Sequence, residues 1–476
     1  MRSMLADVVV IGAGISGCAA AAALADKQRR IVVLEARQAL KPRLAGELIH
    51  PVGVQVLQEL GFMPELCAAG GTSVHGFSVL AAGASEPVRL AYRTMAGSRG
   101  QGFAIEHLAL VSAMRRVVAS CPGVELRFDQ QVKELLYDER RRVCGVVTRE
   151  GLITAPLVLG CDGRNSKVRG LLGVPSQSHL ISFSAGLLLP DAGDLLACPG
   201  FGQVSLGADG PMLFYAISNS DVRCSFDILR DLSGGPRAAA ELVRERYLPQ
   251  LPAALRKRLA ATLPEQLPQL AANEHIRTRN VVVPGAALIG DAGGCSHPLT
   301  ATGISIGLTD AQRLGMLLRP VHSLNDRPQV DAALRQYEID HYRFVRAREI
   351  LADALYDVFR AADPGARAIL GGVLRYWSNS EAARCGSMAL LSGLDSSPVS
   401  FLSEYLKVVA AACHVLACGG RARPELLPLA HSPLQALHGL AGKSLQQLQH
   451  VAGTLGQELM RVCRHRLRST VNGFWP

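Results

Sequence analysis

The stretch Asp7-Val-Val-Val-Ile-Gly-Ala-Gly-Ile-Ser-Gly17 decides the fold of this 476-residue chain. Its apolar start predicts a short buried strand, and the Ala-rich run from Cys18 to Asp26 predicts a helix. Ile31-Val-Val-Leu34 predicts the next strand, which ends on Glu35. Strand, glycine turn, helix, strand and acid in this order are typical of the first βαβ unit of a doubly wound, nucleotide-binding sheet.

The three glycines of the turn suit three separate tasks. Gly12 suits the tight turn, Gly14 a close approach of the backbone to a pyrophosphate, and Gly17 the packing of helix on strand. Glu35 stands close to the distance expected of the acid that holds an adenosine ribose hydroxyl. Because NAD and FAD share the adenosine half, the motif alone leaves the choice of dinucleotide open.

Two later segments place an acid beside a glycine after an apolar strand. Val158-Leu-Gly-Cys-Asp162-Gly163 leads into a basic helix start that faces either phosphates or solvent. Val281 to Ile289 predicts a buried strand that delivers Gly290-Asp291 at its carboxyl end, where α/β sheets bind ligands. Asp291 could accept a hydrogen bond from a ribityl hydroxyl, and a helix that begins at Gly303 would direct its N–H groups at a reduced flavin.

Composition limits the classes of function. Hydrophobic residues make up 49% of the chain, which predicts a large buried core. A net charge of +10 would permit nucleic-acid binding, but aromatic residues make up only 5% and the arginines are spread out, so we expect no nucleic-acid partner. The twelve cysteines show neither CxxC pairs nor metal-ligand spacing, so we expect a reducing cytoplasm and no metal site.

Together the motifs resemble the three signatures of class A flavoprotein monooxygenases, and most of all those of the squalene monooxygenase (squalene epoxidase) family. The blocks that carry the likeness are Arg43-Leu-Ala-Gly-Glu47, Pro51-Val-Gly53, Leu57 to Gly61, Cys161 to Arg169, His297-Pro-Leu-Thr300, Ile304 to Asp310 and, more weakly, Leu391-Ser-Gly-Leu394. Two departures are His107, where the family often has an arginine, and Ala301-Thr302, where it tends to have glycines.

The resemblance implies an α/β fold with three parts: a Rossmann-type FAD-binding domain of the glutathione-reductase-like, aromatic-hydroxylase kind, an inserted mixed β-sheet substrate domain, and a C-terminal helical region. The expected boundaries are 1–75, 100–177 and 275–330 for the discontinuous FAD-binding domain, 76–99 and 178–274 for the substrate domain, and 331–476 for the helical region.

The resemblance also implies roles for single residues. The residues expected to bind FAD are Gly12, Gly14, Gly17 and Glu35 at the ADP half, Asp162 and Gly163 by the pyrophosphate, Gly290 and Asp291 at the ribityl chain, Pro298 and Gly303 beside the isoalloxazine, and Arg43 and His107 nearby. The catalytic candidates are Arg43, Glu47, Pro298 and the pocket tyrosine Tyr92. For His107, the alternative is a partly exposed structural histidine.

The carboxyl-terminal third has two apolar segments. Val399 to Cys418 is apolar nearly all round, although Glu404, Lys407 and His414 interrupt it. A later stripe of apolar residues from Leu434 to Val462, in steps of three and four, predicts a helix with one greasy face and a basic end. The two helices either pack on the body of the protein or form a peripheral membrane contact, so we expect a cytoplasmic protein that is soluble or membrane-associated.

The family likeness implies a monooxygenase that uses FAD, O₂ and NADPH, with NADH as the alternative reductant. It would epoxidise a C=C bond of a lipophilic isoprenoid, polyene or prenylated aromatic such as a quinolone through a flavin C4a-hydroperoxide. Since the chain starts directly at the flavin motif, without the membrane region of eukaryotic family members, we expect bacterial secondary metabolism. The alternatives are an aromatic-ring hydroxylase, a flavin-dependent isoprenoid reductase or cyclase, and a lipid carrier of the Rab-escort type.

Overall fold

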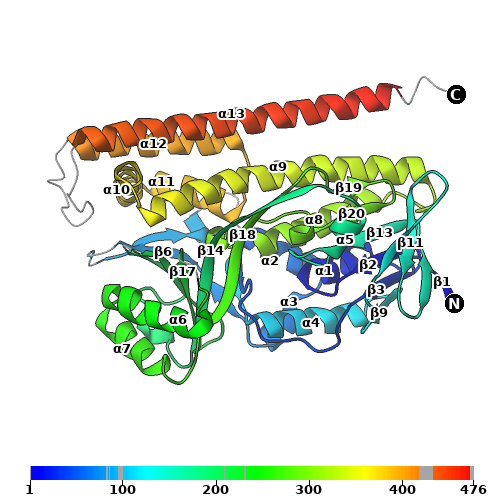
Figure 1. Ribbon diagram of the computed structural model, residues 1–476, viewed down its shortest axis with the longest axis horizontal. Coiled ribbons are helices and arrows are strands. Elements are labelled where there is room, and N and C mark those ends of the chain that lie inside the picture. The colour runs from blue at the N-terminus through cyan, green and yellow to red at the C-terminus, as the bar shows by residue number, and fades with distance from the viewer. Residues whose placement is uncertain are drawn as a thin grey trace.

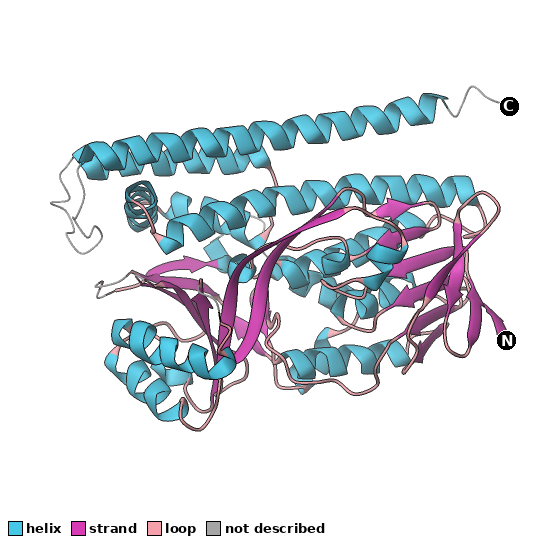
Figure 2. Cartoon of the chain, in the orientation of Figure 1, coloured by secondary structure: helices cyan, strands magenta, loops and turns pink. Residues whose placement is uncertain are grey.

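The computed structural model describes residues 2–81, 84, 86–94, 100–207, 209–229, 232–417 and 433–471, with side chains left out at a few of these positions. Four β-sheets lie side by side under a layer of long helices (Figures 1 and 2). The six-stranded sheet and the seven-stranded sheet form the two halves of the molecule, and the last five helices run over them.

The six-stranded sheet has the nucleotide-binding arrangement that the first motif predicts. Its strands are β19 (Val282–Val283), β20 (Ala286–Leu288), β13 (Leu157–Gly160), β2 (Val8–Ile11), β3 (Ile31–Leu34) and β9 (Val124–Arg127), in this spatial order and parallel except for β19. The helices α1 (Ile15–Leu24), α4 (His107–Ala119) and α8 (Gly303–Leu318) pack against this sheet or against each other. The carboxyl ends of β2, β13 and β20 therefore meet at one edge, as expected of a Rossmann-type α/β fold.

The local structure differs from the sequence expectation at two places in this half. The first helix begins at Ile15, directly after Gly14, and not at Cys18 as the sequence predicts. The apolar run from Val281 to Ile289 is a two-strand hairpin and not a single strand. Pro284 lacks the N–H that a continuous strand would need, and Gly285 takes a positive φ of 80° at the turn.

The seven-stranded sheet lies beside the first. Its strands, in spatial order, are β18 (Gln269–Thr278), β14 (Ser176–Leu189), β17 (Val222–Ile228), β16 (Gly210–Ala216), β15 (Gly202–Gly207), β6 (Gly76–Leu80) and β7 (Val88–Ala91). β18 has no counterpart in the sequence expectation, and it continues this sheet past residue 274. One face packs on α6 (Gly235–Leu242) and α7 (Ala253–Thr262), which were also not foreseen, and the other face packs on the C-terminal helices.

Smaller elements complete the two halves. A four-stranded sheet contains β1 (Arg2–Leu5), β12 (Gly151–Thr154), β11 (Val143–Val147) and β10 (Glu134–Tyr137), and a three-stranded sheet contains β4 (Leu48–Ile49), β8 (Gly102–Ala104) and β5 (Thr72–Val74). The short helices are α2 (Pro51–Glu59), α3 (Met63–Ala68) and α5 (Lys167–Leu171).

The helical layer consists of α9 (Arg327–Arg360), α10 (Pro364–Asn379), α11 (Glu381–Ser392), α12 (Pro398–Ala417) and α13 (Pro433–Val471). The first part of α9 is buried in the core of the six-stranded sheet through Val330 and Leu334, and its later part joins the core of the seven-stranded sheet through Ile350 and Leu351. α9 thus ties the two halves together. α13 is the outermost helix; it runs along α12 and also packs on α10 (Figure 1).

Candidate functional site

The glycine turn after β2 leaves an open helix end. Gly12 has a φ of 102°, and a Cβ there would come within 2.6 Å of the carbonyl oxygen of Cys161. A Cβ on Gly17 would overlap the carbonyl oxygen of Gly12, so helix α1 sits as close to the turn as a glycine allows. At Gly14, by contrast, a Cβ would meet no atom within 4 Å. The space over Gly14 at the amino end of α1 therefore suits a phosphate group.

The carboxylate of Glu35 is held at the same turn. Its Oε2 accepts a hydrogen bond from Ala13 N at 2.9 Å and pairs with Nη2 of Arg115 at 3.2 Å. Nε of Arg115 also donates to Ala13 O at 2.9 Å, so this buried arginine of α4 holds both the turn and the Glu35 carboxylate in place. The sequence interpretation missed Arg115. The available signal was a cation on the apolar face of α4, between Met114 and Val118.

In this structure the carboxylate of Asp162 binds the amino end of helix α5. Its carboxylate accepts hydrogen bonds from Ser166 Oγ at 2.5 Å, Lys167 N at 2.7 Å and Val168 N at 3.1 Å, and thereby caps α5. Gly163 next to it has a φ of 79° and open space where a Cβ would stand. The basic residues after this cap are also engaged, since Nη1 of Arg169 donates to Ala292 O at 3.0 Å. That contact joins the segment to the Gly290–Asp291 loop.

Asp291 is the available carboxylate of the site. It follows β20, and Gly290 before it has a φ of 60°. A Cβ on Gly303 would lie 3.8 Å from Asp291 Oδ1, so the carboxylate faces the amino end of α8. It makes no hydrogen bond to the residues that the structure describes. Burial raises the pKa of Asp291 against the opposing charges of Arg164 and Arg43. A half-buried, unengaged carboxylate at this place can accept a ligand hydroxyl.

Arg43 and His107 form a pair beside this carboxylate. Nδ1 of His107 lies 3.1 Å from Gly46 O and therefore donates, so Nε2 accepts from Nη2 of Arg43 at 3.2 Å. Burial lowers the pKa of His107, and the charge of Arg43 lowers it further. A neutral His107 at the start of α4 thus orients Arg43. The structure brings together two residues that the sequence assigned to the cofactor separately.

Glu47 is engaged by the second sheet. Nε and Nη2 of Arg223 both donate to its carboxylate at 2.8 Å, and the Tyr215 hydroxyl donates to it at 3.1 Å. The pair is buried, so Glu47 links the loop before β4 to β16 and β17. The sequence interpretation missed both partners, although an arginine among the apolar residues of Val222–Ile228 was a signal.

Tyr92 connects through His50 to the loop from His297 to Thr302 that leads into α8, here called the flavin loop. The Tyr92 hydroxyl lies 2.8 Å from Nδ1 of His50, and Nε2 of His50 lies 2.7 Å from the carbonyl oxygen of Thr300. Because Thr300 O can only accept, Nε2 carries the proton and Nδ1 accepts from Tyr92. Burial lowers the pKa of His50 to about 4, so the ring is neutral. The sequence interpretation contained Tyr92 and the loop but not the histidine that joins them.

A second histidine holds the other end of the same loop. Nε2 of His297 lies 3.2 Å from Oδ1 of Asp227, and its Nδ1 accepts from Leu299 N at 3.1 Å. Tyr356 of α9 stacks on the imidazole, with ring centroids 4.1 Å apart, and donates to Asp227 Oδ2 at 3.0 Å. Pro298 directly follows His297 and is exposed. His297 therefore anchors the loop to the second sheet and to α9.

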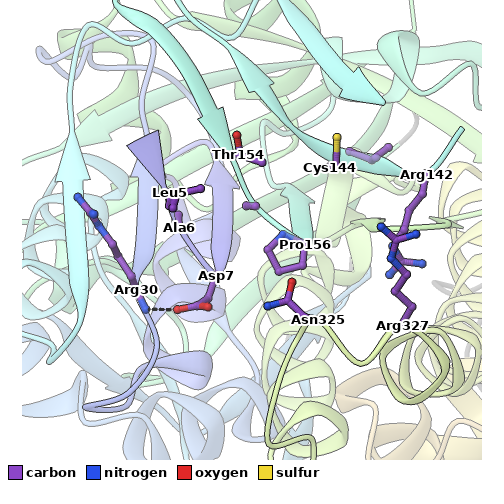
Figure 3. Close-up of a pocket in the computed structure, with 12 residues that line it drawn as sticks. Leu5, Ala6, Asp7, Arg30, Arg142, Cys144, Thr154, Pro156, Asn325 and Arg327 are labelled. Carbon is purple, nitrogen blue, oxygen red and sulfur yellow. Dashed lines mark hydrogen bonds between the residues drawn. The ribbon is translucent and has the colours of Figure 1, made fainter. Parts of the chain in front are cut away.

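The hollow in Figure 3 lies at the opposite edge of the six-stranded sheet. It has a volume of about 500 Å³, and Ala6-Asp7 and Ala155-Pro156 line it just before β2 and β13 begin. Its arginines are balanced by acids, as in Arg142 to Asp331 at 2.6 Å and Arg327 to Asp138 at 2.9 Å. This hollow is therefore separate from the edge that carries the glycine turn. Among the described residues, no group of three or more His, Cys, Asp or Glu is arranged to hold a metal ion.

Comparisons with known proteins agree on one family. The family model "Squalene epoxidase" matches residues 154–423, and "NAD(P)-binding Rossmann-like domain" matches residues 10–66. Squalene epoxidase 2 of Arabidopsis thaliana is 30% identical over 421 residues, which cover 86% of this chain and 71% of that protein. The squalene epoxidase of Schizosaccharomyces pombe is 28% identical over 417 residues, which cover 86% of this chain and 90% of that one.

Solved structures show the same fold. A probable FAD-dependent monooxygenase from Pseudomonas aeruginosa has a TM-score of 0.67 at 22% identity and covers 75% of this chain and 97% of its own. The p-nitrophenol 4-monooxygenase of Pseudomonas putida has a TM-score of 0.66 at 18% identity and covers 86% of this chain and 99% of its own.

The open space at Gly14 leads to a first prediction. We expect Gly14→Val to fold with an unchanged melting temperature of the flavin-free protein but to lose most of its bound FAD, because the added side chain would occupy the phosphate space. The control is Gly170→Val, since Gly170 of α5 has equally open surroundings. Flavin released per protein after denaturation checks this. Equal flavin content in the two variants would contradict the role of Gly14.

The neutral, buried His50 leads to a pH prediction. Its pKa is about 4 when folded, below the ordinary value of 6.5, so the unfolded chain binds more protons between these limits. The free energy of unfolding should therefore fall by about 3 kcal/mol on His50's account as the pH drops through that window. His50→Gln keeps both hydrogen bonds without a titratable group, and its urea unfolding should depend less on pH. Parallel pH curves for the two proteins would refute this account.

Proposed function

The chain belongs to the squalene epoxidase family of FAD-dependent monooxygenases, and we propose that it epoxidises a C=C bond of an isoprenoid, polyene or prenylated aromatic substrate. NADPH is the proposed reductant, with NADH as the alternative, and O₂ is the co-substrate. The match of the Rossmann-like model over residues 10–66 supports FAD and a nicotinamide cofactor in general.

The residues at the carboxyl edge of the six-stranded sheet fit FAD. The open turn at Gly14 and the clamped carboxylate of Glu35 would hold the ADP half, and the unengaged Asp291 would hold the ribityl hydroxyls. The amino end of α8 at Gly303 would face the ring. When bound, the flavin supplies the oxygen-activating chemistry, and the chain supplies binding, orientation and exclusion of water.

The observation that carries the proposed substrate class is the apolar wall beside the flavin loop. Leu299 and Ala301 of this loop pack against a buried apolar cluster between the seven-stranded sheet and the helices α9 to α12. The cluster also contains Tyr92, Leu48, Leu90 and Ile350. A substrate that reached the loop through this cluster would be lipophilic, and its double bond would be shielded from water.

The protonation states near the loop favour epoxidation over phenol hydroxylation. Burial lowers the pKa of both His50 and His107, which makes them weak bases, and both ring nitrogens of each are already hydrogen-bonded; burial also raises the pKa of the Tyr92 phenol, which keeps its proton near pH 7. Hydroxylation of a phenol profits from a base that removes the phenolic proton, whereas transfer of oxygen to an alkene requires none. His50 and His107 are therefore best understood as positioning residues.

We also propose a peripheral membrane contact through α12 and α13. Of the described helices, Pro398–Ala417 alone is long and apolar enough to cross a membrane, and its burial in the molecule is low. Val399 and Leu406 of α12 are 60% and 49% exposed, and Leu445 and Leu448 of α13 are 57% and 41% exposed. The predicted basic end, Arg461 to Arg468, has side chains outside the described ones. Exposed leucines along two outer helices suit the surface of a bilayer.

Vesicle binding tests the membrane contact. We expect the protein to float with vesicles that contain phosphatidylglycerol, and the double variant Leu445→Glu/Leu448→Glu to bind several-fold less, because charges would enter the lipid face. Leu171 of α5 and Leu180 of β14 are 36% and 47% exposed and belong to neither α12 nor α13, so the matched control Leu171→Glu/Leu180→Glu should bind like the parent. Equal binding of the two double variants would argue against this surface.

Turnover tests the proposed activity. The purified protein should be yellow, and a substrate with an isolated alkene should stimulate both NADPH oxidation and O₂ uptake. With ¹⁸O₂, the product should carry one labelled oxygen atom. NADPH oxidation without O₂ uptake would favour a reductase instead. Asp291→Asn should retain less FAD than the parent. The control is Asp209→Asn, which changes a surface ion pair with Arg246 and should retain FAD like the parent.

A further inference from the structure

Arg348 of α9 is a fully buried cation with an unused hydrogen-bonding edge. Its side chain is only 2% exposed. Nη1 donates to Phe344 O at 2.8 Å, and the guanidinium carbon lies 3.2 Å from the centre of the Phe344 ring. Nε and Nη2 are buried and have no hydrogen-bond partner among the residues that the structure describes. These two atoms form the side of the guanidinium that binds carboxylates in a bidentate manner.

The same protein shows what that edge normally binds. Nε and Nη2 of Arg223 meet the carboxylate of Glu47 at 2.8 Å each, in an equally buried place. In the part of the chain that the structure describes, no acid pairs with Arg348 in this way. The negative charge of Asp310 acts on Arg348, but the Asp310 carboxylate is hydrogen-bonded to His341 and to Gly290 N. The burial of a cation without a partner is unfavourable, so a missing partner is expected at this edge.

Arg348 lies on α9, the helix that contacts the flavin loop at Pro298–Thr300. A Cβ on Gly393, at the end of α11, would overlap Nη2 of Arg348 and lie 3.1 Å from Nε, so this side of the guanidinium packs against a residue that has no side chain. The charge of Arg348 also contributes to the low pKa of His50, which binds Thr300 of the loop. On α9, Ile350 and Leu351 follow Arg348 into the apolar cluster. Nε and Nη2 of Arg348 are thus a pair of strong hydrogen-bond donors next to an apolar cluster.

We propose that Nε and Nη2 of Arg348 bind the acceptor oxygens of a polar head group, a carboxylate or a conjugated carbonyl, at one end of an otherwise lipophilic substrate. The inference rests on the proposed function and narrows its substrate class. A pure hydrocarbon would leave the guanidinium unpaired, whereas an oxygenated head would pair with it and set which double bond reaches the flavin loop. Burial lowers the pKa of Arg348 only to about 9, so the cation persists at neutral pH.

The alternative is a purely structural role, in which the guanidinium supports the end of α11 at Gly393. The two roles differ in ligand selectivity. A structural arginine affects all ligands and the stability of the fold alike, whereas a head-group site discriminates between ligands that differ only at one end.

Binding to the oxidised holoenzyme tests the inference without turnover. The probes are farnesoic acid, farnesol and farnesene, which share one isoprenoid chain and end in a carboxylate, a hydroxyl or a hydrocarbon. Titration calorimetry or the change in flavin absorbance gives each Kd. We expect the parent to bind the acid about tenfold or more tightly than the hydrocarbon, since a charge-assisted pair is lost with the head group.

Variants assign that selectivity to Arg348. Arg348→Met keeps most of the volume and should weaken binding of the acid about tenfold or more while leaving farnesene within about twofold. Arg348→Lys keeps the charge without the two-pronged edge and should fall between. The control is Arg346→Met on the same helix, whose arginine pairs with Glu349 at 3.0 Å and should retain the parent's selectivity.

Three outcomes decide the matter. A parent that binds the acid and the hydrocarbon equally overturns the inference, even if Arg348→Met fails to fold. An Arg348→Met variant that loses stability but keeps the preference for the acid overturns it as well and supports the structural role. Selective binding that depends on Arg348, in a protein that does not epoxidise any of the probes, supports the inference while the proposed function fails.

Discussion

A buried hydrogen bond from Nε2 of His297 to the carboxylate of Asp227 ties the flavin loop to the second sheet. Asp227 also accepts from Ser182 of β14 and Tyr356 of α9, so a single carboxylate joins two strands, a helix and the loop. Pro298 follows His297 directly in the chain. The contact with the seven-stranded sheet therefore fixes the position of the flavin loop relative to the six-stranded sheet. The site is thus built by the contact between the two halves of the molecule.

Paired charges occupy most of the site, and this makes the unpaired groups informative. Glu35 is paired with Arg115, Glu47 with Arg223, and Asp310 with His341. Buried polar groups are nearly always satisfied in folded proteins, so an unsatisfied one calls for an explanation. Among the described residues, neither the Asp291 carboxylate nor Nε and Nη2 of Arg348 has a hydrogen-bond partner, and we propose that they serve the polar atoms of the cofactor and of the substrate, respectively.

Local chemistry explains why so much of the nucleotide-binding half could be predicted. A glycine turn depends on φ angles and on neighbours a few residues away, so Gly12 and Gly17 are recognisable without the rest of the chain. The parallel sheet follows from apolar runs that alternate with helical ones. The hairpin at Pro284 and the strand β18 were not foreseen, because their partners in pairing decide them.

By itself, the sequence determined the Rossmann-type turn, the family and the set of candidate residues around a flavin, since these depend on residue type and short-range spacing. Only the tertiary structure decided what the charged and polar groups do. His50 meets Thr300 across 250 positions, and Glu47 meets Arg223 across 176. Such pairs form only when the two sheets and α9 pack together, because hydrogen bonds and ion pairs depend on distances of a few ångströms that no local pattern encodes.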